Sequence, residues 1–412
     1  MKLTRRTLML GGLAAAALSG CGSTPLKPTE TLISAVTHET FPPTTPHVAE
    51  LAAFSRTLGW NILRSGEEGA NRLLSPSSLI SALVLVGLGA SGRTASSLDA
   101  AFGMSAEERA AATNALRYTL AAYEHLPEKV DVDSPPEHPI AHQASRILLI
   151  DDTTPKDPFL DAAKRYFDMG VDRVARSDAE GNLHAWVKQH TAGLIETSAI
   201  EVTADTLLVL QDAILFAARW ATEFSIEAIL PFTTPTGTKD IEVVEDTLTC
   251  RYATAHDWQA IRLPYTEGFA MDVLLPPPGT LPLDAEADLI TELTDLLTGA
   301  TPQPVEVGLP KLDTRHTTDL LTALAGQGIE LGEVGGIVDG AGVGQAMQQA
   351  RLQISAKGTV GAAVTEITVE TSAQIPPAVS FIVDRPYAIN VIAEDTQWSL
   401  FLAAITDPTD KG

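Results

Sequence analysis

The sequence of 412 residues has little cysteine, little basic charge and no apolar run long enough to span a bilayer. Its two cysteines, Cys21 and Cys250, exclude a disulfide framework, so a sizeable apolar core must stabilise the fold. Acidic side chains outnumber basic ones by 52 to 28, and the formal charge of -24 is spread along the chain. Such a field repels polyanions, so we expect neither nucleic acid nor heparin as a partner.

Residues 1–21 predict an export signal. The basic start MKLTRRTLML contains Arg5 and Arg6, and an apolar stretch over residues 8–18 leads to LSGC, which ends at Cys21. LSGC resembles a bacterial lipobox, which implies lipid attachment at Cys21 and an exported, membrane-anchored protein outside the cytoplasm. The arginine pair resembles a twin-arginine export signal. An ordinary cleaved signal is the alternative.

Residues 22–45 are rich in Pro and Thr and have no sustained periodicity. They predict a flexible tether with a reach of roughly 25 to 30 Å; an ordered N-terminal arm is the alternative. Residues 46–412 contain no repeat, charge block or linker, which favours a single α+β domain.

Apolar spacing predicts helices in the first half of the domain and strands mainly in the second. We expect helices from residue 47, after the cap signal Ser75-Pro76, and at 105–124, 157–168, 181–197 and 316–327. We expect strands at 143–150, 207–217, 269–275, 346–355, 378–393 and 398–406.

Two motifs suggest a ligand or metal site but lack the sequence context that such a site needs, and a third motif is absent. Residues 87–92 match GxGxxG, but the apolar run before them begins with a helix cap, so we interpret them as a glycine-rich helix end and expect no nucleotide cofactor. His138 and His142 in HPIAH predict a solvated loop, since no carboxylate or cysteine completes a metal set. No GxSxG elbow is present, so we expect no enzyme activity and no metal.

The segment SAKGTVGAAVTEITVETSAQIPP, residues 355–377, predicts a long strand with unusually small residues in its first half. Alternate positions place Thr359, Gly361, Ala363, Thr365, Ile367 and Val369 on one face. From Thr365 onward that face is apolar and the other is polar, which is typical of a half-buried strand. About thirteen such residues span on the order of 43 Å.

Small side chains lower the steric barrier for a backbone that moves into a tight space, and Ile375-Pro376-Pro377 fixes the far end as extended chain. This composition fits a loop that can later join a sheet centrally. A permanent ordinary strand is the alternative.

Gly358-Thr359-Val360-Gly361-Ala362-Ala363-Val364-Thr365 resembles the loop hinge of inhibitory serpins. Further stretches over residues 47–408 follow the order of that family, among them NRLLSPSSLISALVLVGLGASGRT, LVLQDAILFAARWATEF and RPYAINVIAEDTQWSLFLAAITDP. The resemblance implies a fold of about nine helices and three sheets with an exposed reactive-centre loop. It also implies a suicide-type serine protease inhibitor whose cleaved loop inserts into the central sheet, and we expect a monomer that traps the protease covalently.

The resemblance also implies site residues. Counting the family's loop length from Ala356 places the scissile bond after Ser372, and counting back from the double proline places it after Ala373. Small residues here favour elastase-like or subtilisin-like targets; cleavage after Glu370 is a weaker alternative. Ala356 and Val360 depart from the family's usual glutamates, but nothing in residues 359–365 blocks insertion.

Trp220 matches the family's breach position, and Ser75 and Ser78 match its shutter serines. Asp212 and Gln348 stand where the family pairs Asn with His. A carboxylate that accepts from the amide can replace that hydrogen bond, and we expect burial to raise the aspartate pKa unless the carboxylate is fully hydrogen-bonded. The alternative function is a non-inhibitory binding or scaffold protein with this fold, whose loop is merely a substrate.

Overall fold

The computed structural model describes residues 30–66, 69–360 and 379–412. Within these ranges the chain forms eight α-helices and two short 3-10 helices, close to the nine helices expected. The helices are α1 (Val48–Arg64), α2 (Pro76–Gly87), α3 (Gly92–Phe102), α4 (Ala106–Leu120), α5 (Asp157–Phe167), α6 (Arg176–His190), α7 (Ala287–Gly299) and α8 (Leu320–Ala325), with 3-10 helices at Ala121–Tyr123 and Pro282–Asp284.

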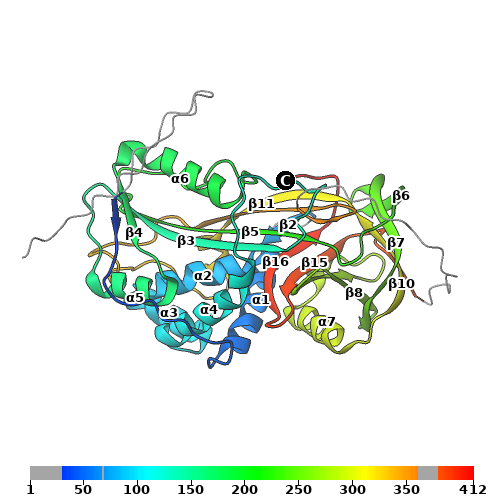
Figure 1. Cartoon of the computed structure of the whole chain (residues 1–412), viewed down its shortest axis with the longest axis horizontal. Helices are drawn as coiled ribbons and strands as arrows, with labels where there is room; N and C mark the ends of the chain where they lie inside the picture. The colour runs from blue at the N-terminus through cyan, green and yellow to red at the C-terminus, as the bar shows by residue number, and fades with distance from the viewer. Residues whose placement is uncertain (1–29, 67–68, 361–378) are drawn as a thin grey trace, which may run out of the picture.

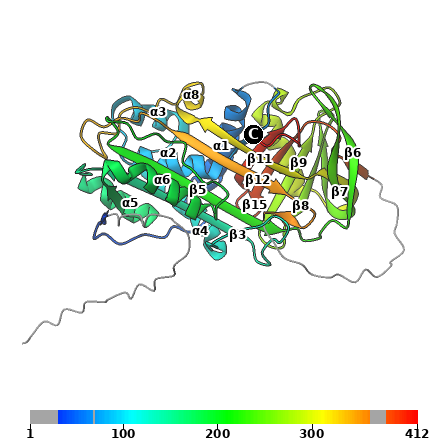
Figure 2. The ribbon, with the colours of Figure 1, turned by 90° about the horizontal axis from the view of Figure 1, so that it is seen from above.

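A seven-stranded sheet runs along the molecule, with α6 on one face and α2 to α5 on the other (Figure 1). Its strands in order are β1 (Glu30–Leu32), β4 (Val171–Val174), β3 (Ile140–Ile150), β5 (Leu208–Arg219), β13 (Gly358–Thr359), β12 (Met347–Ile354) and β11 (Leu312–Asp319). From above, β3, β5, β12 and β11 cross the molecule side by side (Figure 2).

The remaining strands form a second network. In order they are β14 (Val379–Ile382), β10 (Gln303–Pro310), β7 (Gly237–Ala255), β8 (Trp258–Pro264), β9 (Phe269–Leu275), β15 (Tyr387–Ala393), β16 (Trp398–Ile405) and β2 (Arg72–Leu74), with β6 (Ile226–Thr234) paired to β7. The first part of β7 pairs with β6 and β10, and its last residues pair with β8. The three expected sheets are therefore present, with two of them joined through β7.

Local signals explain where the helices on the inner face of the sheet begin. Ser75 caps α2 by accepting from the backbone N–H of Ser78, with Pro76 at the first helical position. Ser105 and Glu108 form a reciprocal capping box at the start of α4. The glycine-rich residues 87–92 end α2 and begin α3, as the sequence predicted.

The structure corrects several predicted elements. Residues 316–319 lie in β11 rather than in a helix, because their threonines pair with β12 and Asp319 caps a short α8. Arg385-Pro386 interrupts the predicted strand over 378–393 and separates β14 from β15. Helix α6 covers residues 176–190 rather than 181–197. His142, predicted in a solvated loop, is buried on β3.

The segment predicted as a tether is an ordered arm over its described part. Strand β1 adds to the sheet edge at β4, and Thr31 Oγ1 donates to Asp172 over 2.7 Å. Further along, the Phe41 backbone N–H donates to Asn114 Oδ1 over 3.0 Å, and the Phe41 ring stacks on Tyr166. The alternative of an ordered arm therefore describes residues 30–45.

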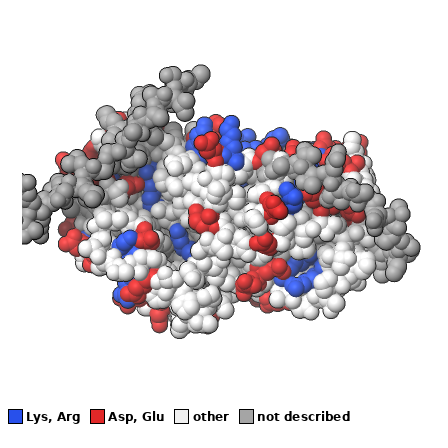
Figure 3. Space-filling view, viewed as in Figure 1, with Lys and Arg blue, Asp and Glu red and all other residues white. Residues whose placement is uncertain are grey.

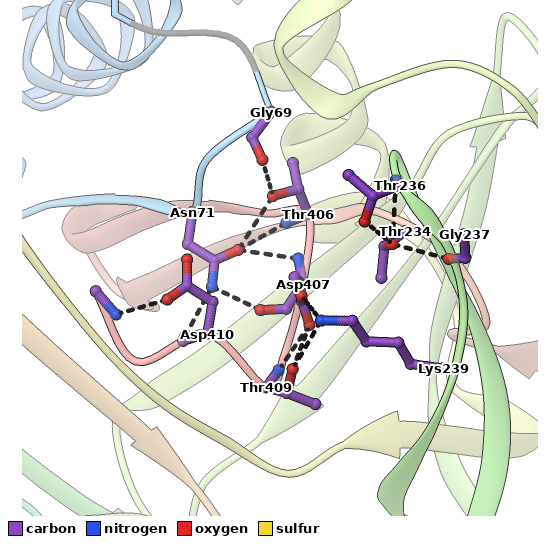
Figure 4. Close-up of polar contacts among 11 residues, drawn as sticks. Gly69, Asn71, Thr234, Thr236, Gly237, Lys239, Thr406, Asp407, Thr409 and Asp410 are labelled. Atoms are coloured by element: carbon purple, nitrogen blue, oxygen red, sulfur yellow. Dashed lines mark hydrogen bonds and ion pairs between the residues drawn. The ribbon is translucent and has the colours of Figure 1, made fainter.

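Polar contacts anchor the C-terminal end of the chain (Figure 4). Asn71 Nδ2 donates to the carbonyls of Asp407 and Asp410, and Lys239 of β7 pairs with the Asp407 carboxylate. On the face shown in Figure 3, acidic side chains are dispersed and lie near small groups of Lys and Arg. None of the helices in the described ranges combines the length and apolar character that a bilayer crossing requires.

Candidate functional site: a seam in the seven-stranded sheet

A two-residue strand lies in the middle of the sheet. After β12 the chain reverses, with the Ser355 N–H donating to the Gly358 carbonyl over 2.9 Å. Gly358 and Thr359 then run antiparallel to both neighbours, opposite Arg219 and Ala218 of β5, with Thr359 also opposite Ile354 of β12. The first residues of the predicted hinge are thus already paired between β5 and β12.

Trp220 and Tyr265 pack against the turn between β12 and β13. Trp220 Nε1 donates to the Ser355 carbonyl over 3.1 Å, and the Trp220 backbone N–H donates to the Lys357 carbonyl over 3.0 Å. The indole is 2% exposed and stacks on Tyr265, whose hydroxyl lies 2.7 Å from Thr359 Oγ1. Trp220 therefore lies where the hinge enters the sheet.

Gly358 and Val360 mark the limits of this short strand. A Cβ on Gly358 would lie 2.3 Å from the Ala218 carbonyl oxygen, so only glycine fits between the two strands. Val360 is buried beside Leu215 and Ala217, but its φ of 50° is a left-handed conformation that a β-branched residue rarely adopts. The end of the described hinge is therefore a strained point.

Beyond β13, toward the start of β5 and of β12, these two strands are not paired with each other. β5 pairs along one edge with β3, and β12 pairs along one edge with β11. Among the described residues, the facing edges of β5 (residues 208–217) and β12 (residues 347–353) have no strand partner. We call the space between these two edges the seam.

The lower part of the seam contains a cavity of about 440 Å³. Its lining is largely apolar and comes from α2 (Leu79, Leu83), β5 (Leu208, Leu210) and the glycine-rich chain before β12. Protein interiors are close-packed, so a cavity of this size in a sheet is unusual. Residues of the chain that leads into β5, among them Ile200 and Leu207, line it as well, so the cavity extends across the seam from α2 to that chain.

Ser75 and Gln348, predicted as shutter residues, join α2 to β12. The Ser75 backbone N–H donates to Gln348 Oε1 over 2.8 Å, and Gln348 Nε2 donates to the Ser75 carbonyl over 3.0 Å. Both residues are buried. Gln348 thus satisfies the backbone of the α2 cap.

Asp212 lies on the opposite edge of the seam, on β5. Its carboxylate accepts from the Ser145 hydroxyl, so the expected hydrogen bond between Asp212 and Gln348 is not formed, and that prediction was wrong. Burial raises the Asp212 pKa to about 6, while Arg117, Ser145 and Ser78 oppose the rise. The direction of the pKa shift agrees with the sequence prediction.

The sequence analysis missed several residues that shape the site. Tyr265 contacts Thr359 of the hinge, and Ser145 donates to Asp212. The side chains of Gln345 and Gln349 bind the chain that follows α6. Nothing in the local sequence distinguishes them, because each acts through a partner far away in the chain. The predicted residues Gly361, Ala362, Ala363, Thr365, Ser372, Ala373 and Cys21 lie outside the described residues.

The described residues give little support for a metal site or a reactive cysteine. Within those ranges, no three His, Cys, Asp or Glu side chains are grouped so that they could hold a metal ion. Cys250 is a free, buried thiol whose pKa burial raises to about 12, which disfavours the reactive thiolate.

Comparison with known proteins agrees with this geometry. Residues 51–408 match the serpin (serine protease inhibitor) family. An uncharacterized serpin-like protein of Thermococcus kodakarensis is 22% identical, with 89% of this chain and 93% of the relative aligned. Protein Z-dependent protease inhibitor of Rattus norvegicus is 25% identical, with 87% and 85% aligned.

Solved structures show the same fold. The thermophilic serpin tengpin in its native state superposes with a TM-score of 0.77 at 19% identity, over 92% of this chain and 99% of that one. Thyroxine-binding globulin in complex with thyroxine gives a TM-score of 0.73 at 18% identity, over 88% and 100%. Since the family match covers most of the domain, from α1 to the last strand, this chain belongs to the serpins, a family made up mostly of protease inhibitors rather than enzymes.

Proposed function

We propose that this protein is an irreversible, suicide-type inhibitor of exported serine proteases. In this proposal the loop over residues 361–378 is the bait, and a protease cleaves it after Ser372 or Ala373. The freed strand then inserts into the seam before the acyl-enzyme is hydrolysed. The observation that carries the proposal is the seam between β5 and β12, whose facing edges are unpaired among the described residues and whose upper end already holds the first two residues of the hinge.

The register of β13 specifies how the strand would insert. Continuing the pairs Gly358–Arg219 and Thr359–Ala218 downward places Thr365 opposite Asp212, and Val369 opposite Leu208. The pairing with β12, from Ile354 opposite Thr359, places Thr365 opposite Gln348. Thr365 would therefore arrive between the two residues that flank the seam.

The alternation of side chains fits the two sides of the seam. Thr359 faces the interior beside Tyr265, so Ile367 and Val369 would face the same side in an extended strand. In this register they lie opposite Leu210 and Leu208, which line the cavity. Burying each aliphatic side chain contributes roughly 1.5 to 3 kcal/mol, and the strand would complete both open backbone edges.

The scissile bond would move far. In the same register Ser372 lies beyond Leu208, the first residue of β5, so a protease acylated there would be carried roughly 45 Å along the sheet. Such a displacement explains how the inhibitor could trap its target and be consumed once. Small residues at the bond favour elastase-like or subtilisin-like targets over trypsin-like ones.

The location of the protein belongs to the proposal as well. Lipid attachment at Cys21 would anchor a monomeric inhibitor to a bacterial membrane outside the cytoplasm, where exported proteases act. The described arm begins at Glu30, nine positions after Cys21 in the sequence, which limits the span between them to about 30 Å. Replacing Cys21 by Ala should release the protein from the membrane fraction, and retention of that variant would contradict the anchor.

Two measurements test the inhibitory function. Incubation with subtilisin-like, elastase-like and trypsin-like proteases should give a denaturant-resistant covalent adduct with one of the first two classes. Cleavage of the loop should raise the melting temperature by roughly 20 °C, since about ten added ladder hydrogen bonds contribute about 1 kcal/mol each. Cleavage with no adduct and little stabilisation would support the alternative, a non-inhibitory binding or scaffold protein.

A further inference from the structure

Arg146 is a buried cation on the outer side of the sheet, next to the seam. It lies on β3 opposite Gln211 of β5, and its Nε and Nη2 both donate to Gln211 Oε1, over 3.0 and 2.7 Å. Asn182 of α6 accepts two further bonds, at its side-chain oxygen over 2.7 Å and at its carbonyl over 3.1 Å. The guanidinium therefore extends over β5 and is covered by α6.

The charge of Arg146 has mostly neutral partners. Within the described residues its ion pair is with Asp172 of β4, whose carboxylate lies 3.7 Å from Nη1. The guanidinium also lies over the ring of Trp186, 5.0 Å from its centre. Burial lowers the pKa of Arg146 to about 10, which reflects the cost of holding this cation away from water. A guanidinium whose Nε–Nη2 edge faces a neutral oxygen is well suited to bind a carboxylate there.

The register of β13 would bring one acidic side chain of the loop to this edge. Continuing that register places Glu366 opposite Gln211 of β5 and Met347 of β12. Thr359 faces the interior, so residue 366, an odd number of positions later, would face outward toward α6. Side chains directly opposite each other in a sheet have Cβ atoms about 4.5 to 5.5 Å apart, so the carboxylate would reach the guanidinium of Arg146.

A small cavity lies at this place in the intact protein. Its volume is about 50 Å³, and Gln211, Met347 and Trp186 are part of its lining. Residues of α2 and the inward-facing Asp212 line it as well, so the cavity extends through the seam from α2 to α6. A cavity of this size can hold a small polar group. Space for a carboxylate is therefore present beside Gln211 before any strand enters.

We propose that Arg146 and Gln211 form a carboxylate site that binds Glu366 when the cleaved strand has inserted. This inference rests on the proposed function, because only the inserted strand makes the contact. The Glu366 carboxylate would take the place of Gln211 Oε1 on the Nε–Nη2 edge of Arg146. Glu366 is the single charged residue between Thr359 and Val369. Buried under α6 without a cation it would oppose insertion, so the site removes that penalty.

The carboxylate site would favour the inserted form selectively. In the intact protein Arg146 keeps the neutral oxygen of Gln211, and it gains a carboxylate only after cleavage. An interaction that is present in one of two states shifts the equilibrium toward that state. Arg146 is therefore a positioning residue for the inserted strand.

The test measures the melting-temperature gain on nicking, each variant being compared with its own intact form, which removes any effect of the substitution on folding itself. Arg146→Gln should lose roughly 10 °C of the gain, because Glu366 would be buried without a cation. Adding Glu366→Gln should restore most of that loss. Glu370→Gln is the matched control: it removes the same charge from the same face of the strand, opposite the exposed Leu207, and should restore nothing.

The outcomes separate the carboxylate site from the proposed function. If Arg146→Gln gains as much as the wild type, or if Glu366→Gln restores nothing, the site is wrong and the proposed function stands. Equal restoration by Glu370→Gln would indicate a general effect of charge and would also overturn the site. If nicking does not stabilise the wild type, the proposed function fails and the site fails with it.

A second variant keeps the test valid if intact Arg146→Gln does not melt cooperatively. Arg146→Lys keeps the positive charge but lacks the planar fork that binds a carboxylate through two donors. We expect a smaller loss of the gain in Arg146→Lys, and restoration by Glu366→Gln but not by Glu370→Gln. An unchanged gain in Arg146→Lys, with no effect of Glu366→Gln, would contradict the site.

Discussion

Ser75 and Gln348 are joined by two reciprocal hydrogen bonds, in which the amide of Gln348 pairs with the N–H and the C=O of Ser75 over 2.8 and 3.0 Å. The contact fastens the first residue before α2 to the inner side of β12. These two hydrogen bonds hold the start of α2 against the β12 edge of the seam.

Replacing Gln348 by Ala should destabilise the protein by about 2 to 3 kcal/mol. The substitution leaves the buried N–H of Ser75 without a partner, and its C=O keeps only the bond from the Leu79 N–H; an unsatisfied buried N–H is costly. Urea unfolding measures the change. Gln353→Ala is the control and should stay within about 0.5 kcal/mol of the wild type; equal losses in the two variants would contradict the role of Ser75.

Replacing Asp212 by Asn should stabilise the protein at pH 8 by about 2 kcal/mol. Burial holds the folded Asp212 pKa at about 6, above its ordinary value, so the folded state binds more protons than the unfolded state between about pH 4 and 6. Wild-type stability therefore falls through that window as pH rises, and the variant lacks this loss. Unfolding at several pH values, with the exposed Asp205→Asn as control, measures it; a gain that persists at pH 4 would contradict the explanation.

Replacing His190 by Gln should remove a pH dependence of the opposite sign. Burial lowers the pKa of His190 to about 4, helped by the neighbouring His142 and Arg146 and opposed by Glu124. Above pH 6.5 His190 is neutral in both the folded and the unfolded state, so its contribution to the free energy of unfolding is complete. As pH falls toward 4 the unfolded state binds the proton first, and the folded state loses stability.

The expected effect at pH 4.5 is a gain of about 2 kcal/mol for His190→Gln relative to its value at pH 7.5, allowing for partial exposure. Melting curves at the two pH values give this difference directly. The exposed His138, which contacts Glu267, provides the control variant His138→Gln. Parallel pH profiles for wild type and His190→Gln would show that this ring does not titrate with unfolding.

Replacing Gly358 by Ala should expel the hinge from the sheet. The added Cβ would approach the Ala218 carbonyl oxygen to 2.3 Å, so β13 must move. Hydrogen exchange should then become at least about tenfold faster at Thr359, while exchange in the middle of β3 stays the same. Gly344→Ala is the control, since a Cβ there meets nothing within 4 Å; retained protection in Gly358→Ala would mean that the sheet can widen.

Replacing Thr365 by Glu should prevent strand insertion. In the proposed register the new carboxylate would be buried beside Asp212 and Gln348, where a second negative charge is unfavourable. Nicked Thr365→Glu should show little of the expected melting-temperature gain and should form no adduct. Thr368→Glu places the same side chain on the outward face and should keep most of the gain; the reverse order would show that the register is wrong.

The sequence predicted well wherever short-range signals agree with long-range packing. The cap Ser75-Pro76 and the apolar run after it define α2, and the nearly continuous apolar run over residues 398–405 defines β16. At 316–319, a helical pattern yields to β11, because pairing with β12 outweighs local propensity. The sequence predicts a tether for residues 30–45, because the order of this arm depends on β4, Asn114 and Tyr166, which are remote in sequence.

The amino-acid sequence by itself determined the small, proline-free hinge, the alternating faces of the strand after it, and the family, since these depend on residue types and their order. Only the tertiary structure decided that the hinge is already paired at Thr359, that Gln348 binds Ser75 rather than Asp212, and that the Ala199 N–H donates to Gln349. Hydrogen-bond partners across a sheet depend on which strands meet and in which register, and a single side chain carries no record of either.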